Sequence, residues 1–156
     1  MINYVQLTKD YNSHFNNLIV NEGKDYEGFL DKGWSLNQII NQLNKDTSLS
    51  FGAFFNKSLV SFIIGDLFNI EKKSEYEILL LYVSKHFRKK GIGSQLLNKI
   101  EENNNRLKKI YLEVSKNNLE AISFYTTMKF KIIYTRKDYF FIDNKRIDAL
   151  VMNKTY

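Results

Sequence analysis

Apolar and polar residues alternate along the chain with two different periods, which divide it into predicted strands and helices. Two-residue alternation or dense apolar runs predict strands at 2–7, 49–55, 59–68, 76–83, 108–114, 130–135 and 147–152. Spacings of three and four residues predict helices at 10–20, from Ser35 onward, from Ile92 to Ile100 and at 118–128. This order, with a strand-helix-strand-helix-strand core, predicts a central sheet with helices packed against it.

Local signals fix some boundaries of these elements. Ser35 and Gln38 have capping-box spacing ahead of the apolar positions 36, 39, 40 and 43, so a helix begins there. The pair Asn56-Lys57 separates two strand-like runs and predicts a tight hairpin. The dense run "YEILLLYV" predicts a strand buried on both faces.

Composition narrows the class of protein. The 156 residues, 44% of them hydrophobic, predict one domain spanning 1–156. The absence of cysteine excludes disulfides, thiolate metal sites and a cysteine nucleophile. The N-terminus lacks the layout of a secretion signal and no apolar run approaches the ~20 residues of a membrane span, so a cytoplasmic protein with no membrane partner is expected.

The net charge of the chain favours an anionic partner but does not identify its class. The net charge of +6 suits a phosphate-bearing cofactor, a nucleic acid or a membrane surface. Because the basic residues are scattered among acidic ones, no direct nucleic-acid binding is expected. The two histidines, His14 and His86, have no metal-ligand spacing, so no metal is expected.

The stretch "RKKGIGSQLL" carries the first chemical signal. It follows a buried strand and opens a helix, whose unpaired N–H groups and positive dipole end receive anions. A simple glycine turn is the alternative. A Walker loop is excluded because Arg88 stands where its first glycine belongs, and a dinucleotide fingerprint because Leu96 replaces its third small residue. The pattern [RQ]-x-x-G-x-[GA] remains, with Arg88, Gly91 and Gly93.

These residues resemble the GCN5-related N-acetyltransferase (GNAT) superfamily. "YLEVSKNNLEAISFYTTMKFKIIYTRKDYF", the later Asp148-Ala149 and "GWS" at 33–35 are similar to the bacterial ribosomal-protein-alanine N-acetyltransferases. The resemblance implies a mixed α/β fold: a mostly antiparallel sheet of about seven strands, splayed at the cofactor site and flanked by about four helices. The sequence departs from the pattern at Gly33, Lys129 and Phe140, where the family has proline, glycine and tyrosine.

The resemblance also implies acetyl-CoA as cosubstrate. The loop before the helix would hold its pyrophosphate, and the backbone of Leu81, Tyr82 and Val83 would pair with the pantetheine arm, with the Val83 N–H facing the thioester oxygen. Asn118, a predicted helix N-cap, would also contact that arm. The remaining residues assigned to the cofactor are Arg88, Lys89, Lys90, Gly91, Ile92, Gly93 and Ser94.

Two side chains are the catalytic candidates. Glu113 lies between Leu112 and Val114 and therefore points to the opposite sheet face, where a carboxylate either faces water or serves as a base. Tyr125 falls on the inward side of its helix, where a packed core tyrosine is the alternative. By resemblance, Glu113 is the general base, acting through water, and Tyr125 the general acid. Without cysteine, direct attack in a ternary complex is expected.

The sequence gives less information about the acetyl acceptor than about the cofactor. By resemblance, a hairpin with its loop near residues 143–145, together with the first two helices, would form the acceptor slot. Trp34, Arg136 and Tyr139 are candidates to line it, with ordinary packing or surface charge as the alternative for each. The resemblance implies the N-terminal alanine of a small-subunit ribosomal protein as substrate. An acetyltransferase of small amines (a polyamine, aminoglycoside or amino acid) and a non-catalytic acetyl-CoA-binding module stay open. The oligomeric state, monomer or weak dimer, is not fixed by the sequence.

Overall fold

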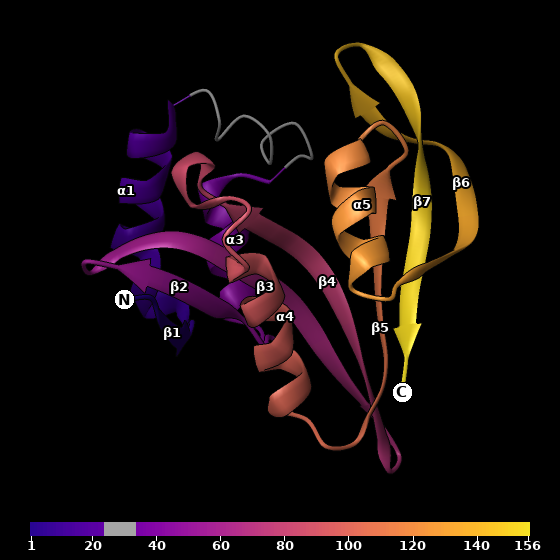
Figure 1. Ribbon diagram of the computed structural model, residues 1–156, viewed down its shortest axis with the longest axis horizontal. Helices are drawn as coiled ribbons and strands as arrows, with labels where there is room; N and C mark the ends of the chain where they lie inside the picture. The colour runs from indigo at the N-terminus through magenta and orange to yellow at the C-terminus, as the bar shows by residue number, and fades with distance from the viewer. Residues whose placement is uncertain (24–33) are drawn as a thin grey trace.

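The computed structural model describes residues 1–23 and 34–156 (Figure 1). Its helices are α1 (Asn12–Glu22), α3 (Leu36–Leu43), α4 (Ile92–Glu102) and α5 (Leu119–Thr127), with 3₁₀ turns η1 (Lys9–Tyr11) and η3 (Lys85–Phe87). Its strands are β1 (Asn3–Gln6), β2 (Phe51–Phe55), β3 (Ser58–Ile70), β4 (Lys73–Val83), β5 (Leu107–Ser115), β6 (Lys131–Ile142) and β7 (Lys145–Thr155). The predicted element order is confirmed.

The strands form one seven-stranded sheet in the order β1-β2-β3-β4-β5-β7-β6. Every neighbouring pair is antiparallel except β4 and β5, which are parallel. The β4–β5 pairing ends at Ile78 and Leu112 although both strands continue. Beyond that point the two strands diverge, as Figure 1 shows, and the expected splayed sheet is confirmed.

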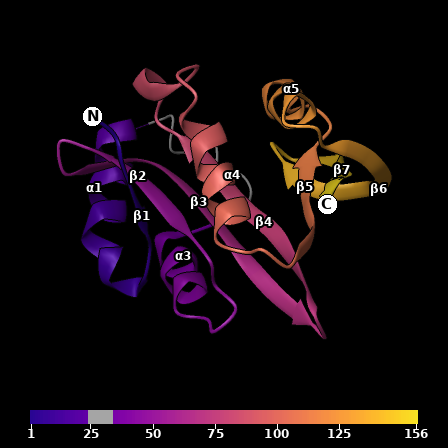
Figure 2. The ribbon, with the colours of Figure 1, turned by 60° about the horizontal axis from the view of Figure 1, so that its bottom comes forward.

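Each face of the sheet carries its own apolar layer. On one face α4 and α5 pack their apolar sides onto the central strands, with Leu96, Leu97, Ile100 and Ile110 fully buried. On the other face α1 and α3 cover β3 and the end of β4 through Phe15, Ile39 and their neighbours. Figure 2 shows α1 and α3 beside the β1–β4 half of the sheet and α5 beside the β5–β7 half.

A bulge in β4 reorients its last residues. The pairing with β3 shifts between Ile64 and Gly65, so Tyr76 and Ile78 face the α4 layer whereas Leu80 and Tyr82 face the α1 layer. Gly65 is required opposite the bulge, because a Cβ there would lie 2.2 Å from the Glu77 carbonyl oxygen. The bulge therefore decides which way the end of β4 presents its backbone.

Several local predictions are confirmed. Ser35 and Gln38 form a capping box, and the Asn118 side chain accepts a hydrogen bond from the Ala121 amide at 3.2 Å. The hairpin residues Asn56 and Lys57 both have positive φ, as a tight turn of this kind demands. Gly33, part of the quoted GWS motif, lies outside the described residues.

Other boundaries were predicted wrongly. The helix predicted from Asp10 starts as the 3₁₀ turn η1, and α1 runs two residues past Val20. The strand predicted at 130–135 is not a separate element: it begins at Lys131 and runs without a break into the hairpin predicted near 143–145, which is confirmed by the Asp143-Asn144 turn and the pairing with β7. Side chains along β6 are almost all exposed, so no two-residue hydrophobic alternation marks the full length of this edge strand.

Lys129 adopts a backbone conformation that suits glycine, the residue expected there. Its φ is +75°, which costs a non-glycine residue about 1–2 kcal/mol. Lys129→Gly removes that strain but makes the unfolded chain more flexible, so we expect a net gain of about 0.5–1 kcal/mol and a melting temperature about 1–4 °C higher by calorimetry. Lys131→Gly, two residues away in the extended strand β6, is the matched control and should lower it.

Candidate active site

A cavity of about 560 Å³ opens between the end of β4, the start of α4 and one side of α5. All the residues predicted to bind the cofactor line it, with the exception of Lys90, which instead places its ammonium over the Phe87 ring at 5.5 Å. Sequence reasoning missed further lining residues: Leu80, Phe87, Glu120, Ala121, Ser123, Phe124 and Thr127. Tyr125 lines the same cavity.

The glycine loop presents backbone donors to this cavity. Gly91 is the N-cap of α4 and has φ +79°, a conformation that side chains rarely adopt. Ile92, Gly93 and Ser94 follow as the first turn, whose N–H groups have no partner within the helix. At Gly93 a Cβ would lie 3.4 Å from the Phe124 ring. The arrangement suits an anionic group such as a pyrophosphate.

The end of β4 offers another backbone donor. The Ser84 amide bonds to the Val60 carbonyl at 2.8 Å, so the next pair along the two strands, Ser61 and Val83, is of the non-hydrogen-bonded type. The Val83 N–H therefore points away from β3, toward the side on which β4 and β5 have separated. The Val83 carbonyl accepts a hydrogen bond from Arg88 Nε at 2.8 Å, which fixes this turn of the chain.

Tyr125 is a buried phenol whose hydroxyl has no hydrogen-bond partner among the described residues. Its exposed fraction is 6%, and its ring packs against Phe124 and Phe130. The hydroxyl makes no hydrogen bond within residues 1–23 and 34–156. A buried hydroxyl without a partner is costly and rare. Burial raises the pKa of Tyr125, so the phenol keeps its proton at neutral pH.

Glu113 lies on the other face of β5. Leu112 and Val114 belong to the apolar layer that contains Tyr125, whereas Glu113 points away from it and does not line the cavity. Its carboxylate pairs with Arg136 Nε at 2.9 Å. It also accepts a hydrogen bond from the Tyr139 hydroxyl, and this bond raises the pKa of Tyr139. The structure thus brings together three predicted residues, one catalytic and two from the acceptor slot.

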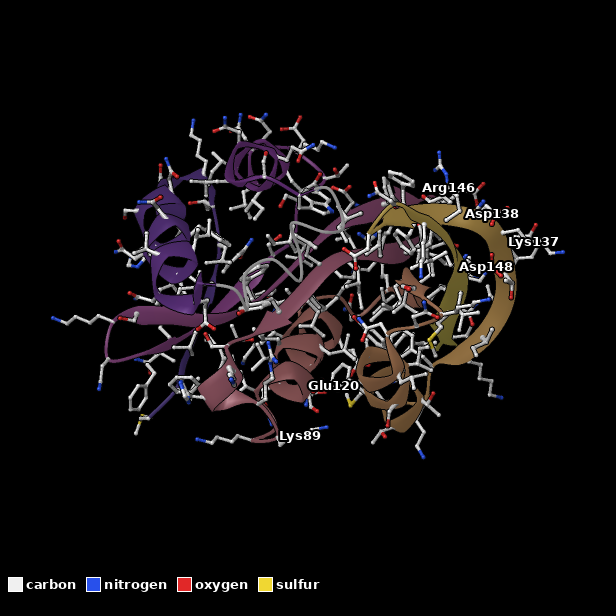
Figure 3. The ribbon with its side chains drawn as sticks, turned by 90° about the horizontal axis from the view of Figure 1, so that it is seen from above. Lys89, Glu120, Lys137, Asp138, Arg146 and Asp148 are labelled. Atoms are coloured by element: carbon white, nitrogen blue, oxygen red, sulfur yellow. The ribbon has the colours of Figure 1, made fainter. Side chains whose placement is uncertain are left out.

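A bulge in β6 lies in the segment that carries Arg136 and Tyr139. The pairing of β6 with β7 is interrupted between Arg136 and Phe140, where Asp138 has φ +53°. The Asp138 amide donates to the Asp148 carboxylate at 3.0 Å, and this bond lowers the pKa of Asp148. Figure 3 shows Asp138 and Asp148 side by side on the two strands. Asp148, quoted above from the family pattern, therefore supports the segment that carries Arg136 and Tyr139.

Glu77 is a functional candidate that sequence reasoning missed. It is half-buried on β4, level with Tyr111 of β5 and one residue before the β4–β5 pairing ends. Burial raises the pKa of Glu77, and the nearby Glu113 and Asp66 raise it further. Tyr111 is hydrogen-bonded to Glu77, and burial together with the Glu77 charge raises the pKa of Tyr111 to about 12. The signal was available in the sequence, because Glu77 interrupts an apolar strand as Glu113 does.

The remaining predicted residues divide between the two sides. Trp34 is partly buried against the α1–α3 layer, whereas Arg136 and Tyr139 are grouped with Glu113 on β5. Lys89, which has φ +61°, forms an ion pair of 3.9 Å with Glu120 of α5. Figure 3 shows this pair on the same edge of the molecule as the cavity-lining helices. Both side chains are largely exposed, so the pair is weak.

No group of three or more His, Asp or Glu side chains among the described residues is placed to hold a metal ion. None of the helices described is long and apolar enough to span a bilayer.

The model of the acetyltransferase (GNAT) family matches residues 8–130, and the chain belongs to this family. Among curated proteins, N-alpha-acetyltransferase 50 of Danio rerio is 33% identical over 109 residues. The match covers 66% of this chain and 62% of the relative, so it spans less than two thirds of that protein.

Solved structures agree with the fold. The ribosomal-protein-S18-alanine N-acetyltransferase of Escherichia coli superposes with a TM-score of 0.80 and 20% identity, over 99% of this chain and 94% of that one. Arabidopsis thaliana NAA60 in complex with acetyl-CoA superposes with a TM-score of 0.79 and 16% sequence identity, over 99% of this chain and 98% of that one. At these sequence identities the structural likeness establishes the GNAT fold and does not identify the substrate.

Proposed function

We propose that this chain transfers the acetyl group of acetyl-CoA to the N-terminal α-amine of a protein. The observation that carries the proposal is one cavity that unites the first turn of α4, the end of β4 and the Tyr125 hydroxyl, which bonds to no other described residue. The named relative is an N-alpha-acetyltransferase, and one similar structure holds acetyl-CoA. Residues 1–156 would act as one domain, without a metal.

The cavity residues would bind and activate the thioester. The N–H groups of Ile92, Gly93 and Ser94 would hold the pyrophosphate, and Asn118 and the β4 backbone the pantetheine arm. The Val83 N–H would stabilise the carbonyl oxygen as it gains charge. Tyr125 would donate its proton to the departing thiolate, a role open to this phenol because it is protonated at neutral pH.

The amine would arrive from the opposite face, where Glu77 and Glu113 lie. Because β4 and β5 separate beyond Ile78 and Leu112, the two faces meet at the splay. An α-amine with a pKa of ~7.7–8.0 must lose a proton before or during attack. The amine nitrogen would bond to the thioester carbon, its proton would pass to the carboxylates, and the carbon–sulfur bond would break.

The acceptor that we propose is a protein N-terminus beginning with alanine, and a small-subunit ribosomal protein is the particular candidate. The grouping of Arg136, Tyr139 and Glu113 on the acceptor face supports it, as does the fold shared with the E. coli S18-alanine acetyltransferase. We place the reaction in the cytoplasm.

The experiment is incubation with acetyl-CoA and a panel of acceptors, read by mass spectrometry. The panel holds peptides beginning with alanine, serine or methionine, the same peptides with a blocked α-amine, spermidine and an aminoglycoside. We expect one acetyl group on the free α-amine, fastest for alanine, and none on the blocked peptides. Acetylation of the small amines alone would replace this proposal with the small-amine enzyme, and binding of acetyl-CoA without transfer would indicate a non-catalytic module.

A further inference from the structure

The end of α1 is attached to the end of β4 through one carboxylate. Glu22, the last residue of α1, accepts a hydrogen bond from the Tyr82 hydroxyl at 3.0 Å through Oε2. Its other oxygen, Oε1, accepts one from the Ser84 hydroxyl. Glu22 lies 60 and 62 residues from these partners in sequence. Both oxygens of one side chain thus hold a single short piece of strand.

The two partners flank Val83, whose N–H is directed toward the splay. Tyr82 and Ser84 are 8% and 3% exposed, so their hydroxyls depend on protein partners. The same piece of strand is held on its other sides by Ser61, which donates to the Tyr82 carbonyl at 2.6 Å, and by Arg88 on the Val83 carbonyl. Glu22 supplies the attachment from the α1 face.

We propose that Glu22 is a positioning residue that fixes the Val83 amide against the thioester by holding Tyr82 and Ser84. This inference rests on the proposed function, since the thioester is its ligand. Glu22 touches neither reacting group in this role. It acts through the backbone of β4, and it makes the geometry of the cavity depend on α1, a helix of the acceptor-side layer.

Kinetics distinguish positioning from mere stability. Glu22→Ala should lower kcat about tenfold or more and leave KM for acetyl-CoA within about threefold, because the donors at α4 are untouched. Glu22→Gln keeps an oxygen acceptor and should stay within about threefold of wild type. Ser84→Ala should reproduce part of the loss, and the Glu22→Ala/Ser84→Ala double variant should be little worse than Glu22→Ala. Glu102→Gln, an exposed carboxylate paired with Lys99, is the matched control.

A second readout needs no catalysis. The Ser84 amide, bonded to Val60, should exchange with deuterium about tenfold faster in Glu22→Ala and at the wild-type rate in Glu22→Gln. Three outcomes would each overturn the inference. They are a wild-type kcat in Glu22→Ala, equal losses of kcat in Glu22→Ala and Glu22→Gln, and a lower kcat in Glu22→Ala without faster exchange of the Ser84 amide. If the wild-type chain transfers no acetyl group, the proposed function fails, and Ser84 exchange still decides whether Glu22 holds the strand.

Discussion

Replacing Tyr125 with phenylalanine is expected to lower kcat for acetyl transfer about 10²–10⁴-fold, the range lost with a general acid. Because the hydroxyl bonds to no other described residue, its removal leaves no protein group unsatisfied. The folded state should therefore melt at or slightly above the wild-type temperature. Single-turnover kinetics with a saturating peptide acceptor and calorimetry on the same sample make the measurement.

Tyr156→Phe provides the control for the tyrosine experiment. It also removes a hydroxyl, which donates to Glu101, and neither residue lines the cavity. Its kcat should match that of the wild type. Equal kcat in wild type and Tyr125→Phe would show that the tyrosine is only a packed core residue, the alternative that the sequence left open.

The second large effect concerns the two carboxylates on the acceptor face. Glu77→Gln and Glu113→Gln should each lower kcat about 10²-fold. If the pair shares one incoming proton, the double variant should be far less impaired than the product of the two losses. Glu75→Gln is the matched control, since Glu75 precedes Glu77 by two residues on β4 and is paired with Lys109 at 3.2 Å.

The pH dependence of kcat tests whether Glu77 acts as a base. Burial and the charges of Glu113 and Asp66 raise the pKa of Glu77, against the smaller opposing effects of the Tyr111 hydrogen bond and Lys45. A base is active without its proton, so kcat should fall as pH is lowered through that raised pKa, above the ordinary glutamate value of about 4.3. Glu77→Gln should remove this fall. Its persistence in Glu77→Gln would assign the ionisation to another group.

Local chemistry made much of the fold predictable. The capping box at Ser35, the cap at Asn118 and the Asn56-Lys57 turn each depend on residues within four positions, so one sequence contains the whole signal. The glycine loop was predictable for the same reason. By contrast, β6 depends on pairing with β7 rather than on any burial of its own, so the sequence did not indicate that the strand at 130–135 and the hairpin near 143–145 form one continuous element.

The site was predictable in its parts and not in its assembly. Alternation along β5 predicted that Glu113 opposes Leu112, but nothing local indicated that Arg136 would pair with it across 23 residues. Nor did the sequence indicate that Glu22 would reach Tyr82 and Ser84. Such contacts arise from sheet order and from the β4 bulge opposite Gly65, which are properties of the folded chain.

Titration of the isotope-labelled protein with coenzyme A, followed by amide chemical shifts, tests whether the cavity binds the cofactor through the backbone amides of the glycine loop and β4. Saturable changes should be largest at Gly91, Ile92, Gly93 and Ser94 and at Val83, with smaller ones on the Glu113 face of β5. Saturable changes elsewhere with those amides unmoved, or no binding at all, would contradict this mode of binding.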